Sequence, residues 1–558
     1  MRKSELLQKY RQLDKECAML SRYQMEENEN QKIFIPDETN MEQIWDRWKS
    51  LCTQVAALEE PDRVFSMVKR HFQDFLESLE YAFHDTEDHP ERYYLAVHWE
   101  IETVSRLNRH PDEERCKELV ESIDQHCKVK EQFLKLIKQK CDIDRKTELA
   151  DEFLEESLTV EKCRLEERKL FPTFSEKQIK QLDESFASLR DALAEIAEEL
   201  AIDKGSGPKI KEDDLTITVK MKEEEYRVLL DKKFGVSLDD LLSWYQEEMD
   251  KTRKHVFDIA AKLDISDPEP KTMQEINDIL VKYEGPCSSP EEMLERANEY
   301  LKRTRAVAHE YVTLPDDEIC RCVKVPESCK ESYPWGGYEG GDFSIRPFRG
   351  QMFLNTYNYQ NVTDGWIKLN SIHEAYPGHH VQYVRAAVDE TPETVKIGAK
   401  LVPLLEGTCL RSEKAFQFIY GEDPFFPLFV AYRRHHASVR ICVDLMLFYF
   451  GKTLEEAVEI YERELGFDRN TARGQVLAQQ YTPGYFTCYY YGMKKICEWE
   501  KEYGFSKQEF TELLFSAGYV SISRFEELIK MTVEERQRYF HEFSSLLSEE
   551  KRHEKGAS

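Results

Sequence analysis

The segment from His373 to His380, which reads His-Glu-Ala-Tyr-Pro-Gly-His-His, constrains the fold more than any other part of the chain. Neutral imidazoles bind Zn²⁺ well, and a glutamate beside a zinc-binding histidine can take a proton from a water that the metal polarises. The segment therefore predicts a zinc-dependent hydrolase that holds one zinc ion per chain and uses Glu374 as its general base.

The spacing of these histidines is incompatible with an unbroken helix. His379 follows His373 by six positions, which places it about 240° round a regular helix. His380 returns to the same face but lies about 10 Å further along the axis, too far for Zn–N bonds of about 2.0 Å. Pro377 and Gly378 predict a bulge that brings His379 back to the metal. We favour His379 over His380 as the ligand; the alternative is a helix end with solvent-exposed histidines.

A third ligand is expected from a carboxylate on a neighbouring helix. Glu406 lies beside an apolar stripe with helical spacing, and a carboxylate that faces the interior needs a cation. Glu413 follows seven positions later on the same face, where we expect it, like His380, to contact a ligand rather than the metal. The alternative is that both glutamates are solvated. The apolar stripe consists of Leu401, Leu404, Leu405 and Leu410.

Four blocks of the sequence resemble a family of uncharacterised bacterial proteins, domain of unknown function 885. The octet resembles its signature, roughly His-Glu-x-x-Pro-Gly-His, and Glu406 to Glu413 aligns with its Glu-Gly-Trp-Ala-Leu-Tyr-x-Glu block. Arg440 and Asp444 align with Arg-x-x-x-Asp, and Pro483 to Gly492 aligns with Pro-Gly-Gln-Ala-x-x-Tyr-x-x-Gly. The order and spacing agree over about 350–495, and a weaker likeness extends upstream to about 215.

The resemblance implies a mainly α, zinc-peptidase-like fold with a small β-sheet near the metal helix and a central channel. Its layout is similar to that of carboxypeptidase Taq and angiotensin-converting enzyme. It implies His373, His379 and Glu406 as zinc ligands and Glu374 as general base. Tyr489 matches the tyrosine of the last block, and we expect it to donate to the carbonyl oxygen that becomes negative during hydrolysis.

The chain departs from the family pattern where substrate walls are expected. Thr408 stands in place of Trp, Arg411 in place of Tyr, Phe448 in place of a common His, and Tyr485 in place of Gln. The metal and base positions keep the family pattern. The resemblance therefore predicts zinc chemistry and leaves the substrate open.

Several further residues are weaker candidates for substrate binding. Arg440 could bind a substrate carboxylate with its planar fork, but Asp444 lies four positions later and favours a salt bridge along the same helix. The other candidates are Tyr485, Arg346 and Arg349.

Composition excludes some classes of partner and compartment. The net charge of −29 argues against a nucleic-acid partner, since phosphates need a basic face. No apolar stretch approaches 18 residues, so we expect no membrane contact. The 14 cysteines are scattered without a Cys-x-x-Cys motif, and the first residues lack the apolar core of a signal peptide. We therefore expect a cytoplasmic protein, and the oligomeric state is left open.

Helical periodicity and turn residues predict the organisation of the chain. Residues 1–204 form a helical region of four to seven antiparallel helices, followed by a linker at 203–208. Residues 209–558 form the catalytic region, and the two regions are expected to build one intertwined, two-lobed unit. Within the second, we expect a strand at 215–219, helices from Ser237 and Ser289, short strands and loops over 315–361, and helices from 365 onward.

Three functions fit these residues. The favoured one is a metallopeptidase that cleaves short peptides. The second is a zinc amidase acting on a small non-peptide amide or ester. The third is a non-catalytic helical scaffold whose zinc is closed by a fourth ligand such as His380 or Glu413; Glu374 argues against it, because a structural site needs no base.

Overall fold

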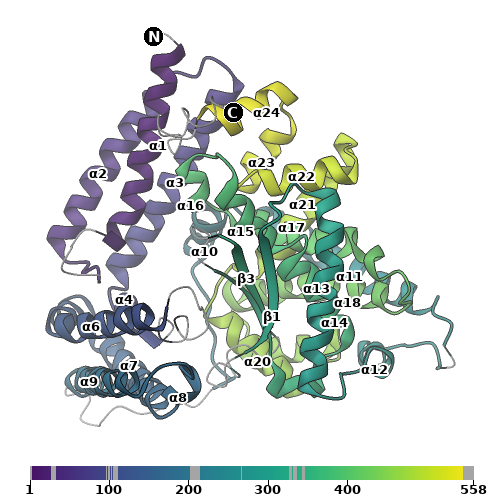
Figure 1. The fold of residues 1–558 in the computed structure, drawn as a ribbon, viewed down its shortest axis with the longest axis horizontal. Helices are drawn as coiled ribbons and strands as arrows, with labels where there is room; N and C mark the ends of the chain where they lie inside the picture. The colour runs from purple at the N-terminus through teal and green to yellow at the C-terminus, as the bar shows by residue number, and fades with distance from the viewer. Residues whose placement is uncertain are drawn as a thin grey trace.

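The computed structural model of the chain describes most of its residues: 3–26, 33–95, 97, 98, 101, 104, 111–201, 214–265, 267–325, 330, 336–341 and 346–543. Helices form most of the described structure, with one small three-stranded sheet (Figure 1). The predicted mainly α fold with a small sheet is therefore confirmed. The predicted linker at 203–208 and the charged tail at 551–558 lie outside the described residues.

The N-terminal part contains six long helices among its described residues, within the predicted range, and two short ones. Their bounds are α1 (Lys3–Glu26), α2 (Glu38–Ala56), α3 (Arg63–Asp88), α4 (Arg92–Leu95), α6 (Asp112–Lys140), α7 (Ile143–Leu165), α8 (Glu167–Leu170) and α9 (Glu176–Ala201). Asp37, Asp62 and Asp142 cap α2, α3 and α7 by accepting hydrogen bonds from the first backbone amides of each helix.

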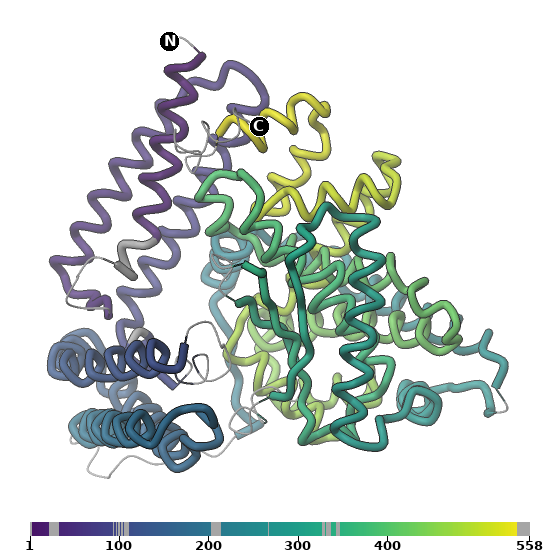
Figure 2. The backbone as a smooth tube through the Cα atoms, in the orientation of Figure 1, coloured from purple at the N-terminus to yellow at the C-terminus, as the bar shows by residue number. Residues whose placement is uncertain are grey.

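These helices divide between two hydrophobic cores. The apolar faces of α1, α2 and α3 belong to the large core that continues to the C-terminal helices. The apolar faces of α6, α7 and α9 form a separate core, at the opposite end of this part of the molecule from the N-terminus (Figure 2). The first described helix lies beside the last described segment, where Arg11 Nε donates to the Glu542 carbonyl at 2.8 Å. The predicted division at 204–209 remains a prediction.

The middle of the chain follows its capping residues. Its elements are α10 (Glu223–Leu229), η2 (Leu230–Phe234), α11 (Leu238–Ala260), α12 (Met273–Tyr283) and α13 (Pro290–Tyr311). Ser237 and Ser289 accept hydrogen bonds from the first turns of α11 and α13, as predicted. The strand predicted at 215–219 is wrong: Thr218 forms an isolated bridge with Thr453, and the pairing does not extend into a ladder because a helix begins at Leu454.

The sheet consists of β1 (Glu318–Lys324), β2 (Gly336–Gly340) and β3 (Phe348–Leu354) in the order β1-β3-β2. β1 is parallel to the central strand β3, and β2 is antiparallel to it. Gly350 in β3 lies opposite both Cys320 and Gly340. Helix α13 packs against β1 and helix α15 against β2, so the sheet lies beside the segment that carries the octet.

The rest of the described chain is helical, as predicted. Its elements are η4 (Thr356–Asn361), α14 (Asp364–Asn370), η5 (Ser371–Ala375), α15 (His379–Val388), α16 (Glu393–Ile397), α17 (Val402–Ala415), η6 (Gln417–Tyr420), α18 (Phe426–Asp444), η7 (Leu445–Phe450), α19 (Leu454–Leu465), α20 (Arg469–Gln480), α21 (Thr487–Tyr503), α22 (Lys507–Ser516), α23 (Ile522–Ile529) and α24 (Val533–Glu542). No helix of the described chain has the length and apolar character needed to cross a bilayer.

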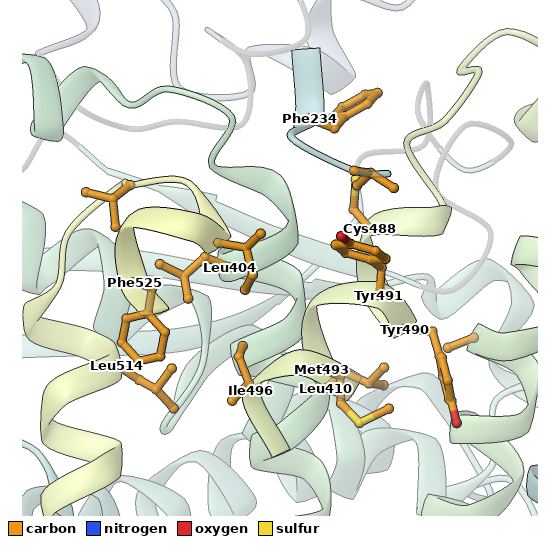
Figure 3. Packing of buried hydrophobic residues seen from close by; sticks show 14 of the residues in the cluster. Phe234, Leu404, Leu410, Cys488, Tyr490, Tyr491, Met493, Ile496, Leu514 and Phe525 are labelled. Atoms are coloured by element: carbon orange, nitrogen blue, oxygen red, sulfur yellow. The ribbon is translucent and has the colours of Figure 1, made fainter. Parts of the chain in front are cut away.

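Helices α17 and α21 approach each other unusually closely. A Cβ on Gly407 would lie 2.5 Å from the Gly492 carbonyl carbon, and a Cβ on Gly492 would lie 1.8 Å from the Pro403 oxygen. Both positions therefore require glycine. Apolar side chains of the two helices, including Leu410 and Met493, pack behind this crossing (Figure 3).

A cavity of about 530 Å³ lies between α3, η2 and the segment that leads into α17. Tyr81, Lys233 and Lys400 are among the residues that line it, and none of the predicted site residues does. The central channel that the resemblance implies remains a prediction.

A buried charge cluster anchors the start of α14, the helix that leads into the octet. Lys368 forms ion pairs with Asp423 and, at 2.8 Å, with Asp364. Glu284 lies 3.6 Å from the same ammonium group, and both of its carboxylate oxygens are buried without a hydrogen bond. Burial, together with the neighbouring Asp423, raises the pKa of Glu284 to about 9.

Replacing Glu284 by Gln is expected to reduce the loss of stability at alkaline pH. The folded protein holds the Glu284 proton more tightly than the unfolded chain does, so stability falls as pH rises from about 5 to 9. Urea unfolding across this range should show Glu284→Gln more stable than wild type by at least about 1 kcal/mol at pH 9. The exposed Glu502→Gln is the control and should follow wild type. Parallel pH profiles of wild type and Glu284→Gln would contradict the buried protonation.

Candidate metal centre

The octet leaves its helix where the sequence predicts. α14 continues into the π-helical turn η5, which ends at Ala375, and Tyr376 has extended backbone angles (φ −134°, ψ 111°). α15 then begins at His379. A Cβ on Gly378 would lie 2.0 Å from the His373 carbonyl oxygen and 2.2 Å from that of Ile372. Only glycine allows the chain to fold back this closely, and the predicted interruption is therefore present.

The interruption brings both rings to one carboxylate. Nε2 of His373 and Nε2 of His379 each lie 3.4 Å from Oε2 of Glu406. Ligands about 2.0–2.2 Å from a tetrahedral ion are about 3.3–3.5 Å apart. Glu406 Oε2 is buried and makes no hydrogen bond of normal geometry, which is unusual for a buried carboxylate. Two of the donor–donor distances therefore match those of a zinc site, and Glu406 contributes an unsatisfied oxygen.

The other nitrogen of each ring is held by a neighbour. His373 Nδ1 donates to Glu413 Oε1 at 2.8 Å, and His379 Nδ1 donates to Gln382 Oε1 at 2.8 Å. With the proton on Nδ1, each Nε2 carries the lone pair that a metal binds. Glu413 therefore lies on the Nδ1 side of His373, opposite Nε2.

The electrostatics of the site favour positive charge between the rings. Burial lowers the pKa of His373, but Glu406, Glu413 and the charge of Glu374 outweigh it and raise this pKa to about 10. Burial would raise the pKa of Glu406, yet the two histidines hold it well below its ordinary value. A cation between these groups therefore meets a fixed, buried negative charge.

Glu374 lies directly beside this set. It is half-buried, unlike the buried His373 that precedes it. No other residue in the described part of the chain forms a hydrogen bond or ion pair with it, so its carboxylate is available to water or substrate.

His380 belongs to a different network. Its Nε2 donates to Glu318 Oε2 at 2.7 Å, and its Nδ1 accepts from the Tyr338 hydroxyl at 2.9 Å. Tyr376 donates to the same Glu318 oxygen at 2.6 Å. A Cβ on Gly350 would lie 2.4 Å from His380 Nδ1, so the sheet also requires a glycine here. Glu318 therefore fixes the turn from the sheet side, and both nitrogens of His380 are engaged away from Glu406.

The two tyrosines considered from the sequence, Tyr489 and Tyr485, lie at the site. The Tyr485 hydroxyl donates to Glu406 Oε1 at 3.0 Å and lies 3.2 Å from the Tyr489 hydroxyl. The Tyr489 ring is nearly parallel to that of His373, at 9° and 6.4 Å between centroids. Tyr490 and Tyr491 instead donate to Glu248 and Asp240, away from the site.

The salt bridge predicted between Arg440 and Asp444 is wrong. Asp444 accepts from the Tyr226 hydroxyl, the Gln479 amide and the Gly484 backbone, which together occupy its carboxylate. Arg440 lies instead over the Tyr489 ring, with its guanidinium carbon 5.5 Å from the centroid.

The two other arginines considered from the sequence form no hydrogen bond or ion pair with the described octet. Arg346 is exposed and pairs with Asp317 at 2.6 Å, and Arg349 is exposed on β3. They are not brought together with Glu374 or Glu406.

A family model for bacterial proteins of unknown function, DUF885, matches residues 24–529. The chain belongs to this family. The family match therefore begins far upstream of residue 215, where the likeness seen in the sequence began. No curated protein matches the chain.

Two solved structures share the fold of this family member along nearly its whole length. The crystal structure of a "putative lipoprotein" from Colwellia psychrerythraea has a TM-score of 0.69 and 16% identity, covering 94% of this chain and 98% of its own. The structure of a "putative lipoprotein of unknown function" from Shewanella oneidensis has a TM-score of 0.67 and 14% identity, covering 95% and 98%. At these identities the likeness shows the fold alone.

These neighbours contradict the cytoplasmic location predicted from the sequence. Both are described as lipoproteins, a class attached to membranes through lipid. The prediction rested on scattered cysteines and on the apolar content of the first residues, and neither feature identifies a compartment. We therefore withdraw it.

The sequence analysis missed several residues at the site. Gln382 orients His379 from nearly one helical turn away, and Glu318 orients His380 from 62 positions away. Cys409 is buried with its sulfur 3.6 Å from His379 Nδ1. The sulfur and one nitrogen of each of His373 and His379 all lie within 4.8 Å of one another. The Gln382 signal was available, since it follows His379 by nearly one helical turn.

Gly378→Ala is expected to disrupt the candidate centre. The added methyl group overlaps two carbonyl oxygens, so the turn must open and separate the histidines. We expect a loss of at least about 2 kcal/mol in unfolding free energy, with metal binding weakened at least tenfold in titrations. Gly474→Ala is the matched control, because nothing lies within 4 Å of its Cβ on α20; it should be neutral or stabilising by up to about 1 kcal/mol. Equal behaviour of the two variants would refute the constraint.

Proposed function

We propose that the protein is a zinc-dependent hydrolase, and specifically a metallopeptidase that cleaves short peptides. One observation carries the proposal: Nε2 of His373 and Nε2 of His379 both lie 3.4 Å from a buried Glu406 oxygen that makes no hydrogen bond. Each opposite nitrogen is fixed by a side-chain oxygen, the arrangement that orients zinc-binding imidazoles.

His373, His379 and Glu406 are the residues that hold the ion in this proposal. When bound, zinc supplies a Lewis acid that polarises a carbonyl and acidifies water. Glu374 follows His373 directly and has no other partner in the described chain. Its carboxylate takes the proton from the water that attacks the amide carbon, and then delivers that proton to the amine as the C–N bond breaks.

The tyrosine pair supports the same reaction. Tyr489 and Tyr485 share a contact between their hydroxyls at 3.2 Å, and Tyr485 also contacts Glu406. Both side chains are half-buried beside the three donors. We assign Tyr489 as the donor to the carbonyl oxygen, because Tyr485 is already committed to Glu406.

The scaffold alternative is less well supported. It requires a fourth protein ligand, for which His380 and Glu413 were the candidates. His380 uses both nitrogens on Glu318 and Tyr338. Glu413 contacts the Nδ1 side of His373, opposite Nε2. Neither is therefore directed at an ion held by the three donors, and the Cys409 sulfur contacts His379 on its Nδ1 side, opposite Nε2.

Two substitutions separate metal binding from turnover. Glu374→Gln should retain about one zinc per chain and lose hydrolysis of short peptides by about a hundredfold to ten-thousandfold, because only the base is removed. His373→Ala should lose the zinc itself. The measurements are zinc content by plasma mass spectrometry and turnover of dipeptides to decapeptides by mass spectrometry.

The exposed Glu502→Gln serves as the control for Glu374→Gln and should retain both zinc and activity. Full activity in Glu374→Gln would remove it from its role. A purified protein that carries no metal and gains none on soaking would exclude the proposed site.

A further inference from the structure

One face of α18 carries three buried basic side chains. Arg433, His436 and Arg440 are spaced by three and four positions, which places them in one row on the helix. They are 5%, 3% and 8% exposed. This row faces Tyr489, because the guanidinium carbons of Arg433 and Arg440 lie 5.8 and 5.5 Å from the centre of its ring.

Arg440 has no carboxylate partner among the described residues. Its Nη2 donates to Gln475 Oε1 at 3.1 Å, and its guanidinium stacks on Phe486 at 4.6 Å. Burial and the charge of Arg433 lower the pKa of Arg440. Arg433 is also poorly compensated: its Nε and Nη1 are buried without hydrogen bonds, and the nearest carboxylate, Glu413, is 3.8 Å away.

The other buried arginines of the described chain provide an internal comparison. Arg115 contacts Asp112 at 3.1 Å, Arg385 contacts Glu512 at 2.6 Å, and Arg411 contacts Glu500 at 3.0 Å. Buried charges are normally paired in this way, since an unpaired one is costly. Among the buried arginines of the described chain, Arg440 alone has no carboxylate partner, and Arg433 has only the more distant Glu413, at 3.8 Å.

The distance from Arg440 to the candidate metal centre matches the length of a short peptide segment. The centre of the Tyr489 ring is 5.5 Å from the Arg440 guanidinium carbon and 6.4 Å from the centre of the His373 ring. The guanidinium carbon is therefore no more than about 12 Å from that ring. An extended chain spans about 3.3–3.6 Å per residue, so the separation corresponds to at most about three residues.

We propose that Arg440, supported by Arg433, binds a carboxylate of the substrate, and that this carboxylate is the C-terminus of a short peptide cleaved within about three residues of its end. This proposal rests on the proposed peptidase function. A guanidinium binds a carboxylate through parallel N–H donors, and Gln475 and Phe486 hold the Arg440 group in one orientation. The substrate carboxylate supplies the negative charge that Arg440 lacks among the described residues.

The first experiment compares matched peptides. One pentapeptide is prepared as the free acid and as the C-terminal amide. Two further pentapeptide amides carry Glu or Gln, respectively, near the C-terminal end. Wild type should cleave the acid with a kcat/KM about tenfold to a hundredfold above that of its amide, as expected for one charge-assisted contact. Product masses should show release of one to three C-terminal residues.

Variants locate the effect at Arg440. Arg440→Gln should remove the preference for the acid by raising KM with little change in kcat, while zinc content stays at the wild-type level. Arg440→Lys should keep part of the preference. Arg463→Gln is the control, because this side chain is 59% exposed on α19, and it should retain the full preference. If Arg440→Gln does not fold, the Lys variant and the acid–amide comparison in wild type still decide the matter.

A binding experiment separates this proposal from the peptidase function. Calorimetric titration of zinc-loaded Glu374→Gln with the same acid and amide should show the acid binding about tenfold to a hundredfold more tightly. Tighter binding of the acid without hydrolysis in wild type would overturn the peptidase function and retain the carboxylate site. Equal binding and equal cleavage of acid and amide would overturn the carboxylate site and retain the peptidase. A preference for the Glu-containing amide over its Gln counterpart, without one for the free acid, would overturn the C-terminal assignment.

Discussion

The close approach of Gly378 to the backbone of Ile372 and His373 determines where every group of the candidate centre lies. A helix that ends at Ala375 and restarts at His379 can present two histidines to one point only if the intervening chain folds back against the helix it has left. The carbonyl oxygens occupy the space that any side chain on residue 378 would need. The separation of both Nε2 atoms from Glu406 by 3.4 Å follows from this contact.

A second close approach supplies the carboxylate. Gly407 and Gly492 allow α17 and α21 to cross with their backbones in contact, and this crossing places Glu406 against Tyr485 as well as against the histidines. The glycine is adjacent to Glu406 in the sequence, so the position of the acid and the depth of the crossing are coupled. The same helix carries Glu413 on the far side of His373, and one helix therefore contributes both the acid between the rings and the acid that orients one of them.

Local spacing made much of this arrangement predictable, and contacts between distant segments account for what it missed. The interruption at Pro377, the inward position of Glu406 and the place of Glu413 could all be read from helical periodicity. The pairing of Arg440 with Asp444 was predicted from the same rule and is wrong, because Tyr226 comes from 218 positions away to occupy the carboxylate. Glu318 was missed for the same reason, since it reaches His380 from a strand. A single sequence does not show which of two possible hydrogen-bond partners lies nearer to a side chain in the folded protein.

The chain has more acidic than basic residues, and this excess makes the missing carboxylate partner of Arg440 in the described chain significant. The chain has 107 acidic and 78 basic residues, so carboxylates are available in excess to neutralise a buried guanidinium. Arg411 shows this directly: it replaces the tyrosine of the family pattern, turns away from the candidate centre and is paired with Glu500. If Arg440 served packing alone, an acidic neighbour would stabilise it at little structural cost, as it does for Arg115 and Arg385. A carboxylate built into the protein at this position would compete with any anionic ligand. Among the described residues Arg440 has no carboxylate partner, and this is the condition under which a substrate carboxylate can bind there.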